Sequence, residues 1–233
     1  MPAPRDARAG RFSDYVNRLA DAIGHADRRE PLRAYVTGLC LAGERKSLEP
    51  RAARIEPRRV RARHQSMHHF VAGAPWQETA VLRVARDFVL GEMDRHGPVA
   101  AWVVDDTGFP TKGQHAVGVA RQSCGVLGKP DTCQVAVSVS LAHDAISVPA
   151  AYQPYLPAAW AKDGTQRRAA GVPPGMVFRT KWQLGLDHFE GRGWRGFHHH
   201  GALCIAAYAF LAAERARLSP PEPLSFLRAA CDP

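Results

Sequence analysis

The spacing of apolar residues changes from helical to strand-like near Gly97-Pro98, and this change constrains the fold more than any other feature. Before it, apolar side chains recur every three or four residues, as they do on one face of a helix. After it, Val99 to Val104 is a compact apolar run with the length of a buried strand. The pattern predicts an α+β fold in which a helical N-terminal region precedes a sheet and a C-terminal helix.

Three helices are expected in the first 98 residues. Ser13 is a candidate cap for the first of them, and Pro31 is a favourable first residue for the second, which ends at Gly43. The third is expected from Gln77 to about Arg95, with Gly97-Pro98 closing it.

Further strand-like runs follow at Ala116–Cys124 and Cys133–Ala142, so three consecutive strands paired as a meander are expected. Residues 149–180 are rich in proline and are expected to form loops. The most apolar run, Ala202–Ala213, is shorter than the roughly 18 residues of a membrane span, which favours a buried helix running to about Arg217. We therefore expect no membrane association.

The cysteines and the N-terminal residues favour a cytoplasmic protein. The first 30 residues contain no apolar secretory segment. The five cysteines are scattered and form no CxxC pair, so reduced thiols are expected rather than a disulfide framework or a zinc ribbon.

The net charge of +9, carried mostly by arginine, suits an anionic partner such as nucleic acid, although arginine-favouring codon usage would give the same bias. The basic segment at 44–64 is a candidate contact for the DNA backbone, and its alternative is a solvated linker. Four further basic residues flank the strand region and could contact phosphates or form a solvated basic rim, namely Lys112, His115, Arg121 and Lys129. The candidate DNA-binding residues are Arg45, Lys46, Arg51, Arg54, Arg58, Arg59, Lys112 and Arg121.

Asp105-Asp106 stands where the first strand is expected to end and a Thr-Gly-Phe-Pro turn to begin. A carboxylate held rigidly at a strand tip can bind Mg²⁺ for phosphoryl transfer, whereas the alternative is an aspartate that caps the turn. His198–His200 is a candidate metal site, but adjacent helical residues point about 100° apart, which favours packing histidines at a helix start. Glu190 is either a further acid or a salt-bridge partner of a nearby arginine.

The string WVVDDTGFPTKGQHAVGVARQSCGVLGKPDTCQVAVSVSL resembles the core of bacterial insertion-sequence transposases of the DDE type, also called DDE superfamily endonucleases. The similarity extends upstream through GLCLAGERKSLEP and downstream to GLDHFEGRGWRGFHHHGALCIAAYAFL. It implies an RNase H-like catalytic domain, Mg²⁺ as cofactor and transposon ends as the DNA partner. It also implies Asp106 as the first catalytic and metal-binding acid, with Asp105 as its neighbour, in a nucleoid-associated protein.

The sequence departs from this family in one large way. In family members a long segment between the TKW and GLDHFEGR motifs carries the second aspartate and the glutamate, whereas here Thr180–Gln183 leads almost directly into Leu184–Asp187. We therefore expect an internally deleted transposase with an incomplete RNase H-like sheet and impaired catalysis. The expected regions are an arginine-rich helical part at 1–98, a partial catalytic core at 99–183 and a C-terminal helical segment at 184–233.

Whether the chain is an enzyme stays open on these grounds. One alternative is a DNA-binding regulator that inhibits an intact transposase, as a homo-oligomer or a mixed oligomer with it. The others are a metal protein that uses His198–His200 and a gene remnant that does not fold.

Overall fold

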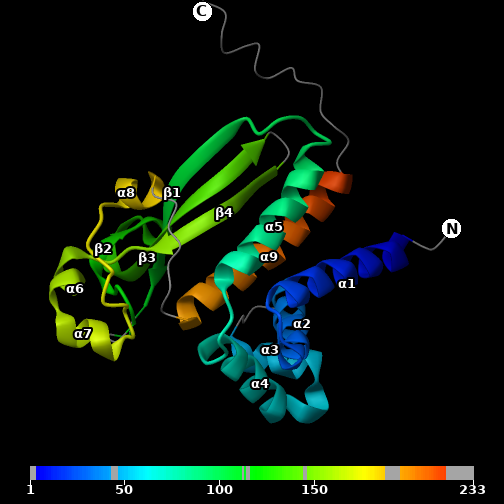
Figure 1. Ribbon diagram of the computed structural model, residues 1–233, viewed down its shortest axis with the longest axis horizontal. Coiled ribbons are helices and arrows are strands. Elements are labelled where there is room, and N and C mark those ends of the chain that lie inside the picture. Colours follow the sequence, from blue (N-terminus) through cyan, green and yellow to red (C-terminus); the bar gives the residue numbers. More distant parts are fainter. Residues whose placement is uncertain are drawn as a thin grey trace, which may run out of the picture.

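The computed structural model describes residues 4–42, 47–111, 113, 116–143, 146–186 and 195–218. The first four helices gather on one side of the molecule, and the strands lie on the other (Figure 1). Two long helices, α5 (Glu78–Met93) and α9 (Arg195–Leu218), pack against each other between these parts, and both contact β4 (Ile146–Pro154). The expected α+β class, with a helical N-terminal region and a C-terminal helix, is confirmed.

The helical part contains two more helices than local spacing indicates. Ser13 lies inside the first helix rather than at its start, and Pro31 lies inside the second. The basic segment, expected as a linker or contact region, folds into two further helices joined by a short 3₁₀ turn. The bounds are α1 (Pro4–Ala22), α2 (Ala26–Cys40), α3 (Leu48–Ile55), η1 (Pro57–Arg59) and α4 (Val60–Ala72).

The main core forms where α1, α5 and α9 meet. The ring of Tyr15 lies 4.5 Å from that of Phe88 and 5.7 Å from that of Phe210, measured between ring centroids. The Tyr15 hydroxyl is buried and donates a 2.9 Å hydrogen bond to the Ala206 carbonyl. The apolar run at 202–213 is therefore a buried helix as expected, and no helix in the described ranges is long and apolar enough to cross a membrane.

The sheet is antiparallel and centred on its longest strand, β3 (Lys129–His143). The strand β1 (Ala101–Pro110) pairs with β3, whereas β2 (Ala120–Cys124) and β4 pair with different stretches of β3. The expected meander is therefore wrong, because β1 does not pair with the next strand in the chain. The remaining elements are η2 (Gly125–Leu127), α6 (Ala158–Lys162), α7 (Gly164–Ala169) and α8 (Lys181–Leu186).

The strand β4 lies in a segment whose prolines predicted loops. Pro149 and Pro154 are both inside it, and β3 is its only strand partner among the described residues. An edge strand tolerates proline because the missing N–H need not donate to a neighbouring strand. The local composition was therefore a poor guide, and pairing with β3 decided the structure.

One ion pair fastens the first helix to the last. Arg11 donates two hydrogen bonds to the buried Glu214 carboxylate, at 2.6 and 2.5 Å. Arg8 and Arg217 lie within 3.4 and 3.6 Å of the same group. The hydrogen bond from Arg11, followed by the neighbouring positive charges, lowers the pKa of Glu214 despite its burial. This contact explains why α1 begins well before the capping residue suggested by local sequence.

We predict that Gly201→Ala destabilises the fold where α9 crosses β4. A Cβ at Gly201 would lie 2.6 Å from the Tyr152 ring, so the helix and strand would have to separate, at a cost of about 1–3 kcal/mol. Gly91→Ala is the matched control, because a Cβ there meets nothing within 4 Å and should stabilise α5 by up to about 1 kcal/mol. Denaturant unfolding measures both changes, and equal effects would contradict the predicted clash.

We predict that Glu214→Gln lowers stability in a pH-dependent way. Because folding lowers the pKa of Glu214, its ion pair stabilises the protein above the ordinary value of 4.5 and loses this effect as pH falls through the folded pKa. The free energy of unfolding should fall by about 1–3 kcal/mol near pH 7, and this difference from the wild type should shrink as the pH is lowered. Chemical unfolding across pH measures it. The control is Glu49→Gln, at an exposed position of α3, which should cost less than about 1 kcal/mol. A stability loss in Glu214→Gln that does not depend on pH would refute the assignment.

Candidate functional site

The two adjacent aspartates point to opposite faces of the sheet. Asp106 pairs with Val137 of β3, and Asp105 pairs with Ser138. Paired residues share a face and successive residues alternate, so the two carboxylates diverge. Asp105 instead accepts a 2.7 Å hydrogen bond from the backbone N–H of Asp106. The pair is thus not arranged to hold one ion together.

The strand that carries them does not end at the pair, as expected, but continues to Pro110. It is also not buried, and β3 is its only strand partner among the described residues. The side chains of Trp102 and Val103 are 69% and 43% exposed. The aspartates therefore occupy the middle of an edge strand rather than the tip of a buried one.

A lysine from a distant segment faces Asp106. The Lys181 ammonium, at the start of α8, donates a hydrogen bond to the Asp106 carboxylate. The same ammonium lies 5.6 Å from the centre of the Tyr155 ring. Both charged side chains are about one-third exposed, at 32% and 38%. Because 75 residues separate the partners, nothing in the local sequence indicated this contact.

The described residues do not fit the metal centre that the resemblance implies. Within the described ranges, no three His, Cys, Asp or Glu side chains lie close enough to hold an ion together. Asp106 is the only acid on its face of β1, and it meets an internal cation instead. Glu190 and Asp187 lie outside the described residues.

His199 is a packing residue, as its position at a helix start favoured. Its ring is 1% exposed and stacks on Trp76, with 3.7 Å between ring centroids. Its two ring nitrogens lie 2.9 Å from the carbonyl oxygens of Val71 and Trp76. Both nitrogens are thereby engaged, and neither is free to bind a metal. The side chains of His198 and His200 lie outside the described residues.

The cysteines in the described ranges form no disulfide, and the thiols of Cys133 and Cys204 are poorly suited to nucleophilic chemistry. Cys124 and Cys133 are buried together on the β2–β3 hairpin. Burial, reinforced by the neighbouring Cys124, raises the pKa of Cys133, and burial raises the pKa of Cys204 to about 11. A thiol that stays protonated at neutral pH is a weak nucleophile.

The structure divides the arginines of the basic segment into two groups. Arg51 is 4% exposed and lies 4.9 Å from the centre of the Tyr35 ring, so it faces the core and not a DNA surface. Its expected role in DNA contact is dropped for this reason. Arg54 donates to the Ala42 carbonyl, and Arg63 binds Glu56. These guanidinium groups position the helices.

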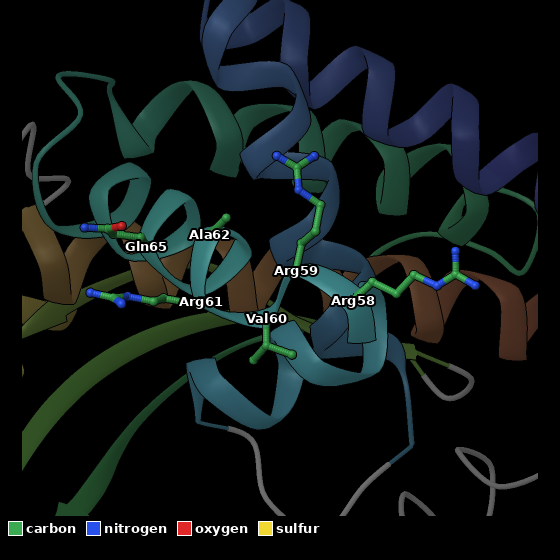
Figure 2. Close-up of a pocket in the computed structure, with 6 residues that line it drawn as sticks. All are labelled: Arg58, Arg59, Val60, Arg61, Ala62 and Gln65. Carbon is green, nitrogen blue, oxygen red and sulfur yellow. The ribbon is translucent and has the colours of Figure 1, made fainter.

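The second group lines a surface pocket of about 370 Å³ where η1 leads into α4. Figure 2 shows Arg61 and Gln65 extending together from α4, whereas Arg58 extends the opposite way and Arg59 points toward α2. Among the described residues, no ion pair or hydrogen bond engages the side chains of Arg58 or Arg61. Arg59 lies 3.8 Å from Glu56 and stays mostly exposed.

Of the remaining expected DNA contacts in the described residues, Arg121 is not brought to this pocket. Arg121 is exposed on β2, well separated from α3 and α4 in Figure 1. Arg45, Lys46 and Lys112 lie outside the described residues. Gln65 was missed by sequence reasoning, although its helical spacing from Arg61 could have revealed it.

Comparisons with known proteins agree with the motifs. The profile of the DDE superfamily endonucleases matches residues 18–213. A probable transposase for insertion sequence element IS701 from Microchaete diplosiphon is 28% identical over 122 residues, covering 52% of this chain and 32% of that protein. The chain thus spans about a third of the length of that curated relative. No solved structure matches significantly. Since the family profile covers most of the sequence, this chain belongs to the DDE superfamily endonucleases.

Proposed function

We propose that this chain is an insertion-sequence transposase that binds DNA at transposon ends but is impaired in metal-dependent strand cleavage and transfer. The observation that carries the proposal is the contrast between its two candidate sites. A basic pocket is exposed and ready for an anionic partner, while the carboxylate of the catalytic motif is met by an internal lysine. DNA binding would place the protein with the nucleoid in the cytoplasm.

The basic pocket supports DNA binding through its charge and exposure. Arg58, Arg59 and Arg61 come from consecutive turns of one segment, and their guanidinium groups present planar hydrogen-bond donors. Such groups bind phosphate oxygens and displace the counterions of the duplex. Internal ion pairs would compete with DNA, and of these three arginines only Arg59 approaches an acid within the described residues.

Impaired cleavage is supported by the surroundings of Asp106. Two-metal phosphoryl transfer requires several acids that converge on the reacting phosphate. Asp105 diverges from Asp106, and Lys181 comes from the segment just before the point where family members carry their additional acids. We therefore assign no catalytic step to Mg²⁺ in this chain.

A regulator of an intact transposase is the second candidate, and the edge of β1 that pairs with no described strand favours it. An edge strand presents unpaired backbone groups that can bind a strand of another chain. Trp102 and Phe109 add exposed apolar surface, being 69% and 45% exposed. Mixed oligomers with an intact transposase would cover this edge, and so would homo-oligomers.

We predict that Arg58→Ala/Arg59→Ala weakens DNA binding and its salt dependence. For every phosphate that the variant no longer neutralises, the plot of log affinity against log salt should flatten by about 0.9. Fluorescence anisotropy with a labelled duplex at several salt concentrations measures this slope. The control is the Arg83→Ala/Arg86→Ala variant on α5, which loses the same two positive charges as Arg58→Ala/Arg59→Ala. Its salt slope should stay close to that of the wild type. Equal slopes for the two variants would place the DNA surface elsewhere.

We predict that the purified protein does not nick supercoiled DNA in Mg²⁺ or Mn²⁺, because one carboxylate cannot position two ions. Conversion of supercoiled plasmid to the open circular form, followed on a gel, measures nicking. Asp106→Asn serves as the control for contaminating nucleases, since it should match the wild type. Robust nicking that disappears in Asp106→Asn would show that the enzyme is active.

A further inference from the structure

We propose that α3, η1 and α4 form a helix-turn-helix unit whose second helix, α4, reads base edges in the major groove of double-stranded DNA. In this assignment Arg61 and Gln65 are the specificity-determining residues, and Arg58 contacts the phosphate backbone. The inference rests on the proposed DNA binding and goes beyond it, since backbone contacts alone do not distinguish one sequence from another.

The first support is the packing of three helices. Helix α2 contacts both α3 and α4, and α3 contacts α4 across the short turn. Gly38 allows this close approach, because a Cβ there would lie 3.1 Å from Ile55 Cδ1 and 3.2 Å from Arg51 Cβ. Two helices joined by a tight turn and supported by a third are the arrangement that holds a recognition helix.

The second support is the fixed orientation of α4. Met67, Phe70 and Val71 are buried and face the helical core. Arg63 is 16% exposed and binds Glu30 of α2 at 2.8 Å and Glu56 of the turn at 2.6 Å. These contacts prevent α4 from rotating about its axis, so its outer face is defined.

The third support is the chemistry of that outer face. Arg61, Gln65, His68 and Ala72 are exposed at helical spacing, and the sequence of α4 contains no acidic residue. Arginine pairs with the O6 and N7 acceptors of guanine, and glutamine pairs with the N6 and N7 groups of adenine. Figure 2 shows Arg61 and Gln65 extending to the same side of α4. In the proposed orientation both side chains would reach neighbouring base pairs.

Arg58 suits a different role. It stands on η1, outside the helix, and extends away from Arg61 and Gln65 in Figure 2. When an α-helix lies in the major groove, side chains that flank it reach the sugar-phosphate backbone on either side. Arg58 would therefore add affinity that is independent of base sequence.

The experiment is selection of the full chain on a random 20-base-pair duplex library, followed by sequencing of the bound DNA. The wild type should enrich a motif. Arg61→Ala should relax the preference for a guanine within it, and Gln65→Ala that for an adenine, each by about tenfold or more at that base pair. Arg58→Ala should keep the motif and lower affinity for all sequences alike. Gln166→Ala on α7 is the control for glutamine removal, and circular dichroism checks that each variant folds.

The outcomes separate this inference from the proposed function. Wild-type binding without an enriched motif, or a motif unchanged by both Arg61→Ala and Gln65→Ala, would overturn the recognition role of α4 and leave general DNA binding intact. Absence of any DNA binding by the folded wild type would reject both. Loss of preference in the Arg58→Ala variant alone would also overturn the assignment.

Discussion

The burial of α9 against α5 and β4 is the constraint on which the rest of the structure depends. Alanines at 202, 206, 209 and 213 are almost fully buried and let neighbouring elements approach closely. Polar groups on the same helix are matched to partners, with His199 between two carbonyls and Glu214 bound by Arg11. A buried polar group without such partners would cost about 1–3 kcal/mol. The helix therefore fits in one position, and it brings the helical part and the sheet together.

Burial also explains why the arginines of one basic segment do different things. Arg51 and Arg63 lie near the core, where an unpartnered guanidinium is costly. Arg63 binds two carboxylates, whereas Arg51 lies against the Tyr35 ring and its buried Nε and Nη1 make no hydrogen bond within the described residues. Arg58 and Arg61 remain in water and keep their hydrogen-bonding capacity for a ligand. In the described part of the basic segment, the fold thus uses some arginines for its own stability and leaves others exposed at η1 and the start of α4.

The Lys181–Asp106 contact is a matter of charge balance rather than of stability. An ion pair in which both side chains are about one-third exposed contributes at most about 1 kcal/mol. The contact matters because of its position. The Lys181 ammonium binds the Asp106 carboxylate, which the resemblance to the family implies as a metal ligand. Beside this contact, one edge of β1 pairs with no strand among the described residues.

The sequence by itself determined the order of helical and strand regions, the buried C-terminal helix and the family, because these depend on local periodicity and on contiguous motifs. It also indicated that the triple-histidine segment contains a packing residue. Only the tertiary structure decided that β1 pairs with β3, that the proline-containing β4 is an edge strand of the sheet, and that Lys181 binds Asp106. It likewise separated Arg51 from Arg58. These outcomes depend on contacts between residues far apart in the chain, or on which side of a helix or strand is buried. The spacing of neighbouring residues contains neither kind of information.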